Sequence, residues 1–240
     1  KLGGRKIGYE LDESNSWAAT EEELKTRLTE AQENGLDIKA PAIINPGNPT
    51  GQVYARSDLE VICKFCADNG IVLLADEVYQ RNVYTPEKEF LSVKKVILET
   101  PGCETLQLVS FHSTSKGIIG ECGRRGGYME LHNIDSYVQS QLYKLASSGL
   151  CSNVPGQIMM SLMVKPPQPG EASYERFAQE EREIFDGLRR RAEALVVGII
   201  KFDCIECNPA DGAMYSFTRS YILQTSIYYA DYQYLTPDAL

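Results

Sequence analysis

The stretch Ile71–Tyr79 (IVLLADEVY) decides the fold, because an apolar run ends abruptly in two acidic residues. Residues 71–75 have the length and composition of a buried strand. The pattern of residues 57–69 before it is helical, and Ala42–Ile44 is an earlier short apolar run. Strand, helix and strand in this order predict parallel pairing. We therefore expect an α/β protein with a mostly parallel sheet flanked by helices.

Further patterns extend this domain in both directions. Residues 105–111 and 126–130 predict two more strands. Thr20 and Glu23 form a capping box, in which each side chain accepts a free backbone donor. Helices are predicted over residues 21–34, 134–147, 154–164 and 174–200.

The Pro-rich stretch 165–170 is the predicted domain boundary. Residues 1–168 would form a large domain, of which we expect an N-terminal part to be missing because the chain begins at Lys1. Residues 169–240 would form a linking helix and the start of a smaller C-terminal α+β domain. The tail 218–240, with five tyrosines, is predicted to be atypical of such a domain.

Composition excludes several classes of partner. The chain has 240 residues and a net charge of −9, so it offers no basic stripe for nucleic acid or an anionic membrane. It has no apolar run near the roughly 18 residues that span a bilayer. Its seven cysteines are an odd number, which favours reduced thiols inside a cell. The cytoplasm is the expected location, and the mitochondrion stays an alternative.

Two polar clusters follow predicted strands. Asn45–Gly51 (NPGNPTG) reads as a turn, but a rigid loop at a strand end is also where open α/β sheets bind ligands. Asp76 has two readings. It could cap a following helix, or it could hold a heterocyclic nitrogen protonated, as pyridoxal phosphate requires.

A third cluster is Ser113–Lys116, followed by Gly123–Tyr128 (GRRGGY). A lone lysine after a strand is usually a solvated surface residue. Hydroxyl groups and an arginine beside it could instead hold a phosphate, and a desolvated lysine is a good imine-forming amine.

Together these clusters resemble the fold-type I, class I pyridoxal-phosphate aminotransferases in order and approximate spacing. The resemblance is closer still to the eukaryotic alanine aminotransferases. It covers about residues 2–217 and includes Gly120–Gly123 (GECG), Ser152–Gln157 (SNVPGQ) and Gly212–Phe217 (GAMYSF).

The resemblance implies roles for individual residues. Lys116 would be the Schiff-base lysine and the catalytic base, and Asp76 would pair with the pyridinium nitrogen. Asn48 and Tyr79 would hydrogen-bond the phenolic oxygen of the cofactor. The residues implied to hold its phosphate are Ser113, Ser115 and Arg125.

Arg124 departs from this pattern, because the family usually has an aromatic residue there. The adjacent arginines leave a choice, and Arg125 fits the Gly-x-Arg-x-Gly-Tyr pattern. The arginine that holds the substrate carboxylate in the family has no counterpart before Leu240.

The implied reaction transfers the amino group of L-alanine to 2-oxoglutarate, giving pyruvate and L-glutamate, in a homodimer. Its partners are small amino acids and 2-oxo acids. Glutamate–glyoxylate aminotransferase shares these motifs and is the nearest alternative. A fragment that does not turn over on its own is the alternative of another class.

Three other signals have simpler readings. Cys63 and Cys66, together with Cys204 and Cys207, could form a split zinc site, but their separation argues against it, and no metal is expected. His112 beside the lysine loop is expected to pack rather than to catalyse. The charged residues 173–191 are expected to form a solvated helix face.

Overall fold

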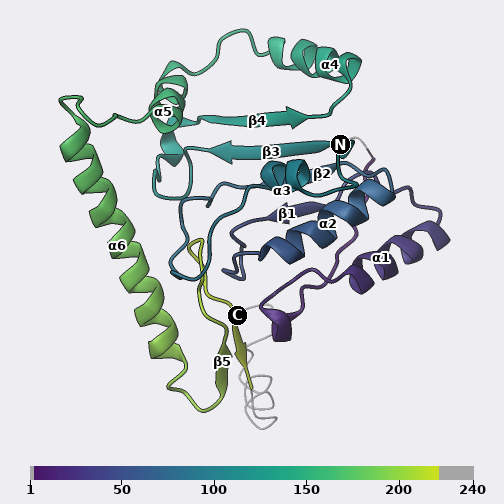
Figure 1. Cartoon of the computed structure of the whole chain (residues 1–240), viewed down its shortest axis with the longest axis horizontal. Coiled ribbons are helices and arrows are strands. Elements are labelled where there is room, and N and C mark those ends of the chain that lie inside the picture. The colour runs from purple at the N-terminus through teal and green to yellow at the C-terminus, as the bar shows by residue number, and fades with distance from the viewer. Residues whose placement is uncertain (1–2, 222–240) are drawn as a thin grey trace, which may run out of the picture.

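The computed structural model describes residues 3–221, and its centre is a sheet with the strand order β1-β2-β3-β4 (Figure 1). The strands are β1 (Ala42–Ile44), β2 (Leu73–Asp76), β3 (Leu108–Ser113) and β4 (Gly127–His132). The first three run parallel and β4 runs antiparallel to β3. The expected α/β fold with a mostly parallel sheet is thus confirmed.

The described residues contain six α-helices, of which α1 precedes β1 and the others connect or follow the strands. Their bounds are α1 (Glu21–Glu33), α2 (Arg56–Asp68), α3 (Val93–Glu99), α4 (Ser136–Ser147), α5 (Val154–Val164) and α6 (Tyr174–Ile199). Short 3-10 turns are η1 (Glu13–Asn15) and η2 (Cys122–Arg124). Only α3 lies where the sequence pattern predicted no helix.

The start of α1 corrects the predicted capping box. The Thr20 hydroxyl accepts from the Glu23 amide at 3.2 Å, as expected. The Glu23 carboxylate does not return to the Thr20 amide. It accepts instead from the Glu10 amide at 2.8 Å and from the Arg27 guanidinium at 2.8 Å. These contacts lower the pKa of Glu23 and tie the preceding segment to α1.

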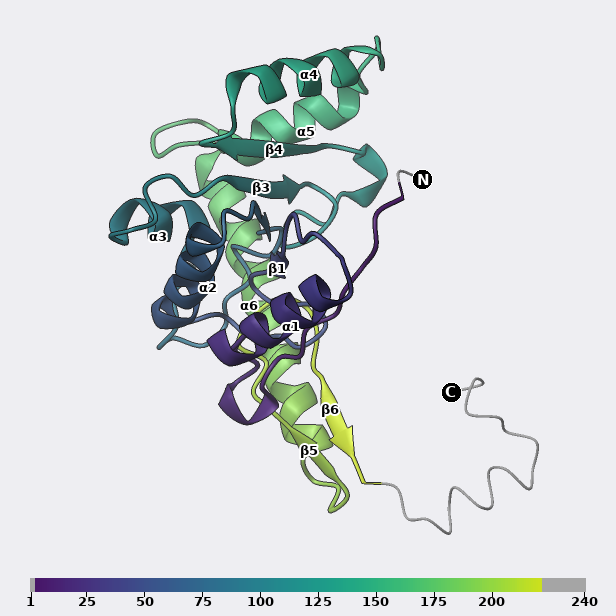
Figure 2. The same cartoon turned by 90° about the vertical axis from the view of Figure 1, so that its right-hand side faces the viewer.

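The core forms on one face of the sheet. Ile43, Leu73, Ala75 and Leu108 from the four-stranded sheet are buried in one cluster with apolar side chains of α2 and α3. From α2 the cluster takes Leu59, Ile62, Cys63, Phe65 and Cys66. The helices α4 and α5 lie next to β4, at the edge of the sheet (Figure 2). The buried face fixes the strand register, and so aligns the strand ends.

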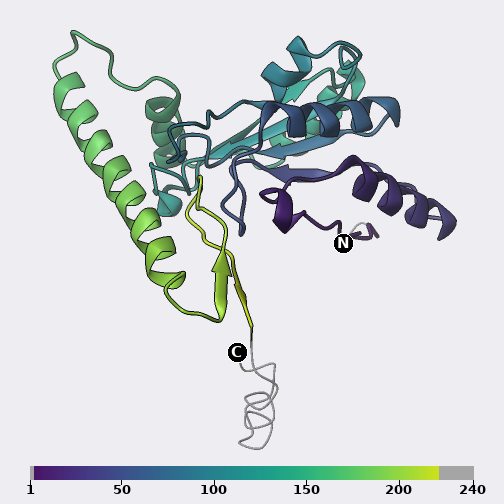
Figure 3. The same ribbon diagram turned by 60° about the horizontal axis from the view of Figure 1, so that its bottom comes forward.

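The chain returns to the sheet after α6. It forms a two-stranded antiparallel sheet of β5 (Ile205–Cys207) and β6 (Thr218–Ser220), and the segment between them runs back to the ends of the parallel strands (Figure 3). The division at residue 168 falls in the connection between α5 and α6 and stays a prediction. Most of the atypical tail, residues 222–240, lies outside the described residues.

Candidate active site

The predicted clusters meet at the carboxyl edge of β1, β2 and β3. Ile44, Asp76 and Phe111 are register partners on adjacent strands. The backbone pairing continues one residue further, because the Asn45 amide donates to the Asp76 carbonyl at 3.0 Å. Parallel strands end together at one edge, and this is where open α/β sheets bind ligands.

The loop after β1 is anchored by Asn45 and presents Asn48. Asn45 is buried, and its side-chain oxygen accepts from the Tyr54 amide at 3.2 Å. The Gly47 amide donates to the Gln52 carbonyl at 2.8 Å, which closes the loop on itself. Asn48 is exposed, and within residues 3–221 its side chain has no hydrogen bond. Its amide therefore stays available to a ligand.

Asp76 ends β2 and is half-buried. One carboxylate oxygen accepts from the Val78 amide at 3.2 Å, which shapes the turn that follows. The alternative that Asp76 caps a following helix is wrong, since the next helix begins at Val93 and is capped by Ser92. Among the described residues Asp76 forms no ion pair. Its second oxygen is free to accept from a protonated nitrogen.

Tyr79 lies in the turn after Asp76 and meets Tyr215. Their hydroxyl oxygens are 2.7 Å apart, and the two rings meet edge to face at 5.7 Å. Tyr79 is only 2% exposed. Burial raises the pKa of the Tyr79 phenol above its ordinary value. The phenol therefore stays protonated and can donate.

Residues 211–215, here called the strap, hold Tyr215 in place across the strand ends. The Gly212 amide donates to the Gly51 carbonyl at 2.9 Å, and the Ala213 amide donates to the Asn82 carbonyl at 2.9 Å. A β-carbon on Gly212 would lie 2.5 Å from that Asn82 oxygen, so the close approach requires glycine. The strap thus joins the loop after β1 to the turn after β2.

The Tyr79–Tyr215 contact was not predicted. The run Gly212–Phe217 contributed to the resemblance, but no role was assigned to any of its residues. No local pattern indicates a contact between residues 136 positions apart.

The lysine loop starts at the end of β3. Thr114 is fully buried, and its amide donates to the Gly126 carbonyl at 3.1 Å, which closes the loop that carries Lys116. A β-carbon on Gly117 would lie 3.0 Å from the Val78 carbonyl oxygen. The backbone of Gly117, which follows Lys116, is thus close to the turn after Asp76. Its side chain is exposed.

Two serines precede Lys116 in this loop, and one hydrogen bond joins them. The Ser113 hydroxyl accepts from the Ser115 amide at 3.3 Å, and both side chains are half-buried. Hydroxyls in such a short turn can donate to an anion while the backbone amide orders them.

Arg124 ends η2 and Arg125 follows it, and their side chains have different partners. The Arg124 guanidinium lies 3.4 Å from the Glu121 carboxylate, whereas that of Arg125 donates to the Cys122 carbonyl at 2.8 Å. Arg125 has a φ of 56°, and α5 lies close to it, since a β-carbon on Gly156 would be 2.8 Å from the Arg125 carbonyl oxygen. In the described part of the chain Arg125 lacks an acidic partner. The choice of Arg125 over Arg124 stays a prediction.

His112 lies on β3 beside the lysine loop. Its ring packs against that of Tyr128 at 5.9 Å, and burial lowers its pKa although the charge of Asp76 acts in the opposite direction. In residues 3–221 its Nδ1 has no hydrogen-bond partner. The ring is therefore neutral and packed, as a structural residue would be.

Pyridoxal phosphate fits the donor set at this edge. Lys116 and Arg125 form no ion pair in the described ranges, and Ser113 and Ser115 precede Lys116 in the same loop. Asp76 offers a carboxylate to a protonated ring nitrogen, and Tyr79 and Asn48 offer donors. An anionic group, a ring N–H and a phenolate oxygen would each find a complementary side chain.

Other candidate sites in the described residues have weaker chemistry. No group of three or more His, Cys, Asp or Glu side chains there is placed to bind a metal. Cys63 and Cys66 are buried in α2. No described helix is long and apolar enough to cross a membrane.

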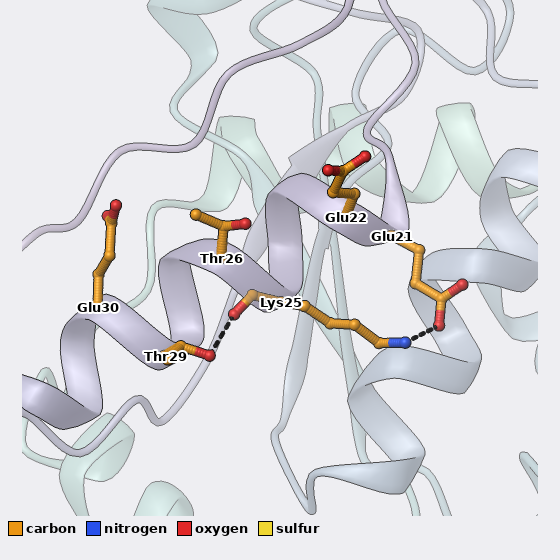
Figure 4. A pocket seen from close by; sticks show the side chains of 6 residues that line it. All are labelled: Glu21, Glu22, Lys25, Thr26, Thr29 and Glu30. Carbon is orange, nitrogen blue, oxygen red and sulfur yellow. Dashed lines mark hydrogen bonds and ion pairs between the residues drawn. The ribbon is translucent and has the colours of Figure 1, made fainter.

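A hollow on the outer side of α1 is lined by residues of that helix alone (Figure 4). Lys25 there pairs with Glu21 at 2.6 Å, while Glu22 and Glu30 point away from it. Both partners of the pair are well exposed, so this is a solvated helix surface.

The comparison with protein families decides the assignment, because the model of aminotransferase class I and II matches residues 2–222. The chain belongs to this family.

Relatives with a curated name are similar over nearly the whole chain. Alanine aminotransferase 1, mitochondrial, of Arabidopsis thaliana is 47% identical over 98% of the chain and 44% of its own length. Glutamate–glyoxylate aminotransferase 1 of the same plant is 46% identical over 91% of the chain and 46% of its own length. The chain thus spans about half the length of these relatives.

A solved structure shows the same fold. Alanine aminotransferase from Pyrococcus furiosus matches with a TM-score of 0.77 at 24% identity, over 92% of the chain and 51% of that structure. The family assignment therefore agrees with the architecture of the sheet.

Proposed function

We propose that the protein is a pyridoxal-phosphate-dependent alanine aminotransferase, which transfers the amino group of L-alanine to 2-oxoglutarate. The observation that carries the proposal is the meeting of Asp76, Tyr79 and the Lys116 loop at one edge of the sheet, through the Gly117–Val78 approach. The relatives named alanine aminotransferase at 44–47% identity support the choice of substrate.

Each residue would contribute a separate function. Pyridoxal phosphate supplies an electron sink for negative charge at the substrate α-carbon. Lys116 binds the cofactor through its amine and moves a proton at that α-carbon. Asp76 keeps a proton on the ring nitrogen. Tyr79 and Asn48 donate to the phenolic oxygen, while Ser113, Ser115 and Arg125 hold the phosphate.

The covalent site can be tested directly. The purified protein is incubated with pyridoxal phosphate, reduced with borohydride and mapped by peptide mass spectrometry. We expect the label on Lys116 and its loss in Lys116→Ala, with transamination falling by at least about 100-fold because the base is lost. Lys144→Ala is the matched control, since Lys144 is an exposed lysine on α4. Label spread over several lysines would contradict the proposal.

The second candidate is a glutamate–glyoxylate aminotransferase, favoured by a relative of that name at 46% identity. Rates of amino transfer to glyoxylate and to pyruvate, from the same enzyme preparation, separate the two. A value of kcat/KM for glyoxylate above that for pyruvate would replace alanine aminotransferase as the proposed function.

Two further properties belong to the same proposal. We expect a homodimer, which light scattering of the purified protein would test, and a single-chain mass would contradict it. The cytoplasm is the proposed location, and the mitochondrion is the alternative supported by relatives whose names include that compartment. Imaging of the tagged full-length protein distinguishes the two.

A further inference from the structure

The hydroxyl pair of Tyr79 and Tyr215 is a side-chain contact between the strap and the turn after Asp76. The two oxygens are 2.7 Å apart, and either one can be the donor. A phenol hydroxyl donates one hydrogen bond and can accept another. The direction of the pair is therefore set by whatever third group Tyr79 meets.

We propose that Tyr215 is a positioning residue of the cofactor site, which donates its hydroxyl proton to the Tyr79 oxygen. This inference rests on the proposed function. With its oxygen occupied as an acceptor, Tyr79 directs its own proton to the phenolic oxygen of the cofactor. Hydrogen bonds in a chain polarise one another, so Tyr79 also becomes a stronger donor.

The strap gives Tyr215 a fixed position for this task. The Tyr84 hydroxyl donates to the Ala213 carbonyl at 2.6 Å, and the Thr85 hydroxyl donates to the Asp211 carboxylate at 2.9 Å. Tyr84, Ala213 and Asp211 are all buried. Both contacts fix the backbone of the strap close to Tyr215, so its hydroxyl needs no large rearrangement to reach Tyr79.

A purely structural role would need only the ring. The two rings meet at an angle of 88°, and phenylalanine would keep this edge contact. The hydroxyl adds no packing that the ring lacks. Removing it by Tyr215→Phe therefore separates positioning of the Tyr79 proton from packing.

The experiment compares Tyr215→Phe, Tyr79→Phe and the double variant with the wild type. The dissociation constant of pyridoxal phosphate and the pH midpoint of the absorbance change of the bound cofactor are measured. Tyr215→Phe is expected to weaken binding by about 2- to 10-fold. The midpoint should move to higher pH, because a weaker donor stabilises the negative phenolic oxygen less.

The double variant tests whether Tyr215 acts through Tyr79. We expect it to match Tyr79→Phe, because a residue that acts through another adds nothing once that residue is disabled. Tyr137→Phe is the control, since Tyr137 on α4 is 71% exposed. It should leave the dissociation constant and the midpoint unchanged.

Three outcomes would overturn the inference, and the label at Lys116 distinguishes its failure from that of the proposed function. If the wild type is labelled at Lys116 but Tyr215→Phe behaves like it, or if the two tyrosine effects simply add, Tyr215 has no positioning role and the proposed function stands. If borohydride reduction fails to label Lys116 in the wild type, the proposed function and this inference both fall.

Discussion

Glu77 should make the protein less stable as the pH rises through the weakly acidic range. It follows Asp76 directly, but its carboxylate lies on the side of α3, where it accepts from the Val93 amide at 2.8 Å. The residue is only 7% exposed. Burial raises its pKa from 4.5 to about 7, and the hydrogen bond from Val93 opposes this only in part.

The sign follows from proton binding. Between pH 4.5 and about 7 the native protein keeps the Glu77 proton, while the unfolded chain has released it. The native state then binds more protons, so the free energy of unfolding falls as the pH rises through this window. At about 1.4 kcal/mol for each tenfold change in proton affinity, the full loss is about 3 kcal/mol.

Glu77→Gln removes the ionisation but keeps an oxygen that can accept from Val93. The free energy of unfolding is measured by urea titration of both proteins at several values between pH 4.5 and 8. We expect similar stabilities at pH 4.5 and an advantage of about 3 kcal/mol for Glu77→Gln at pH 8. Glu87→Gln, at an exposed turn residue, controls for the loss of one negative charge.

A constant difference between Glu77→Gln and the wild type over this pH range would refute the reasoning. It would mean that Glu77 is ionised in the native protein throughout, and that the contact with the start of α3 outweighs burial.

Three further predictions use other contacts. Gly212→Ala should destabilise the protein by about 1–3 kcal/mol, because its β-carbon would lie 2.5 Å from the Asn82 oxygen. Gly187→Ala in α6, with its nearest atom at 3.9 Å, should instead stabilise it by about 0.5–1 kcal/mol in the same urea titration. Ser92→Ala should cost about 1 kcal/mol through loss of the α3 cap, and equal unfolding midpoints would contradict this. The pKa of His112, measured by NMR, should lie below its ordinary value of 6.5 because the ring is buried. The stability that the neutral ring contributes is then lost as the pH falls below 6.5. A pKa above 6.5 would contradict a neutral, buried ring.

Local signals predicted the long helices well. The helix of residues 154–164 coincides with α5, and Thr20 marks the start of α1, because caps and apolar periodicity act within a few residues. The strand Ala42–Ile44 coincides with β1, whereas β2 and β3 begin later than predicted, at Leu73 and Leu108. The apolar residues before them lie in turns and still pack, as buried Ile71 and Leu106 do.

The helix α3 shows where local reasoning ends. It has seven residues, too few for an apolar period to be distinguished from a strand or a turn. Its capping residue Ser92 is a common one, and its buried positions Val93, Val96 and Ile97 become informative only once the sheet beneath them is known.

In the candidate site, too, some residues could be placed from the sequence and one could not. Asn48, Asp76 and Lys116 follow strand ends, so the parallel sheet alone predicts that they share an edge. The role of each residue is still a prediction. Tyr215 could not be placed from the sequence, because its contact with Tyr79 depends on how α6 returns the chain to the sheet.

The long separation of Tyr79 and Tyr215 has a consequence for synthesis. The ribosome adds roughly 5–20 residues per second, so the 136 positions between them take roughly 7–27 s. Later in that interval, once Ser113 has been added, the chain contains β1, β2 and β3 but not yet the strap. If the sheet forms on the ribosome, its carboxyl edge would stay without the strap until residues 211–215 are made, for a time set by translation speed.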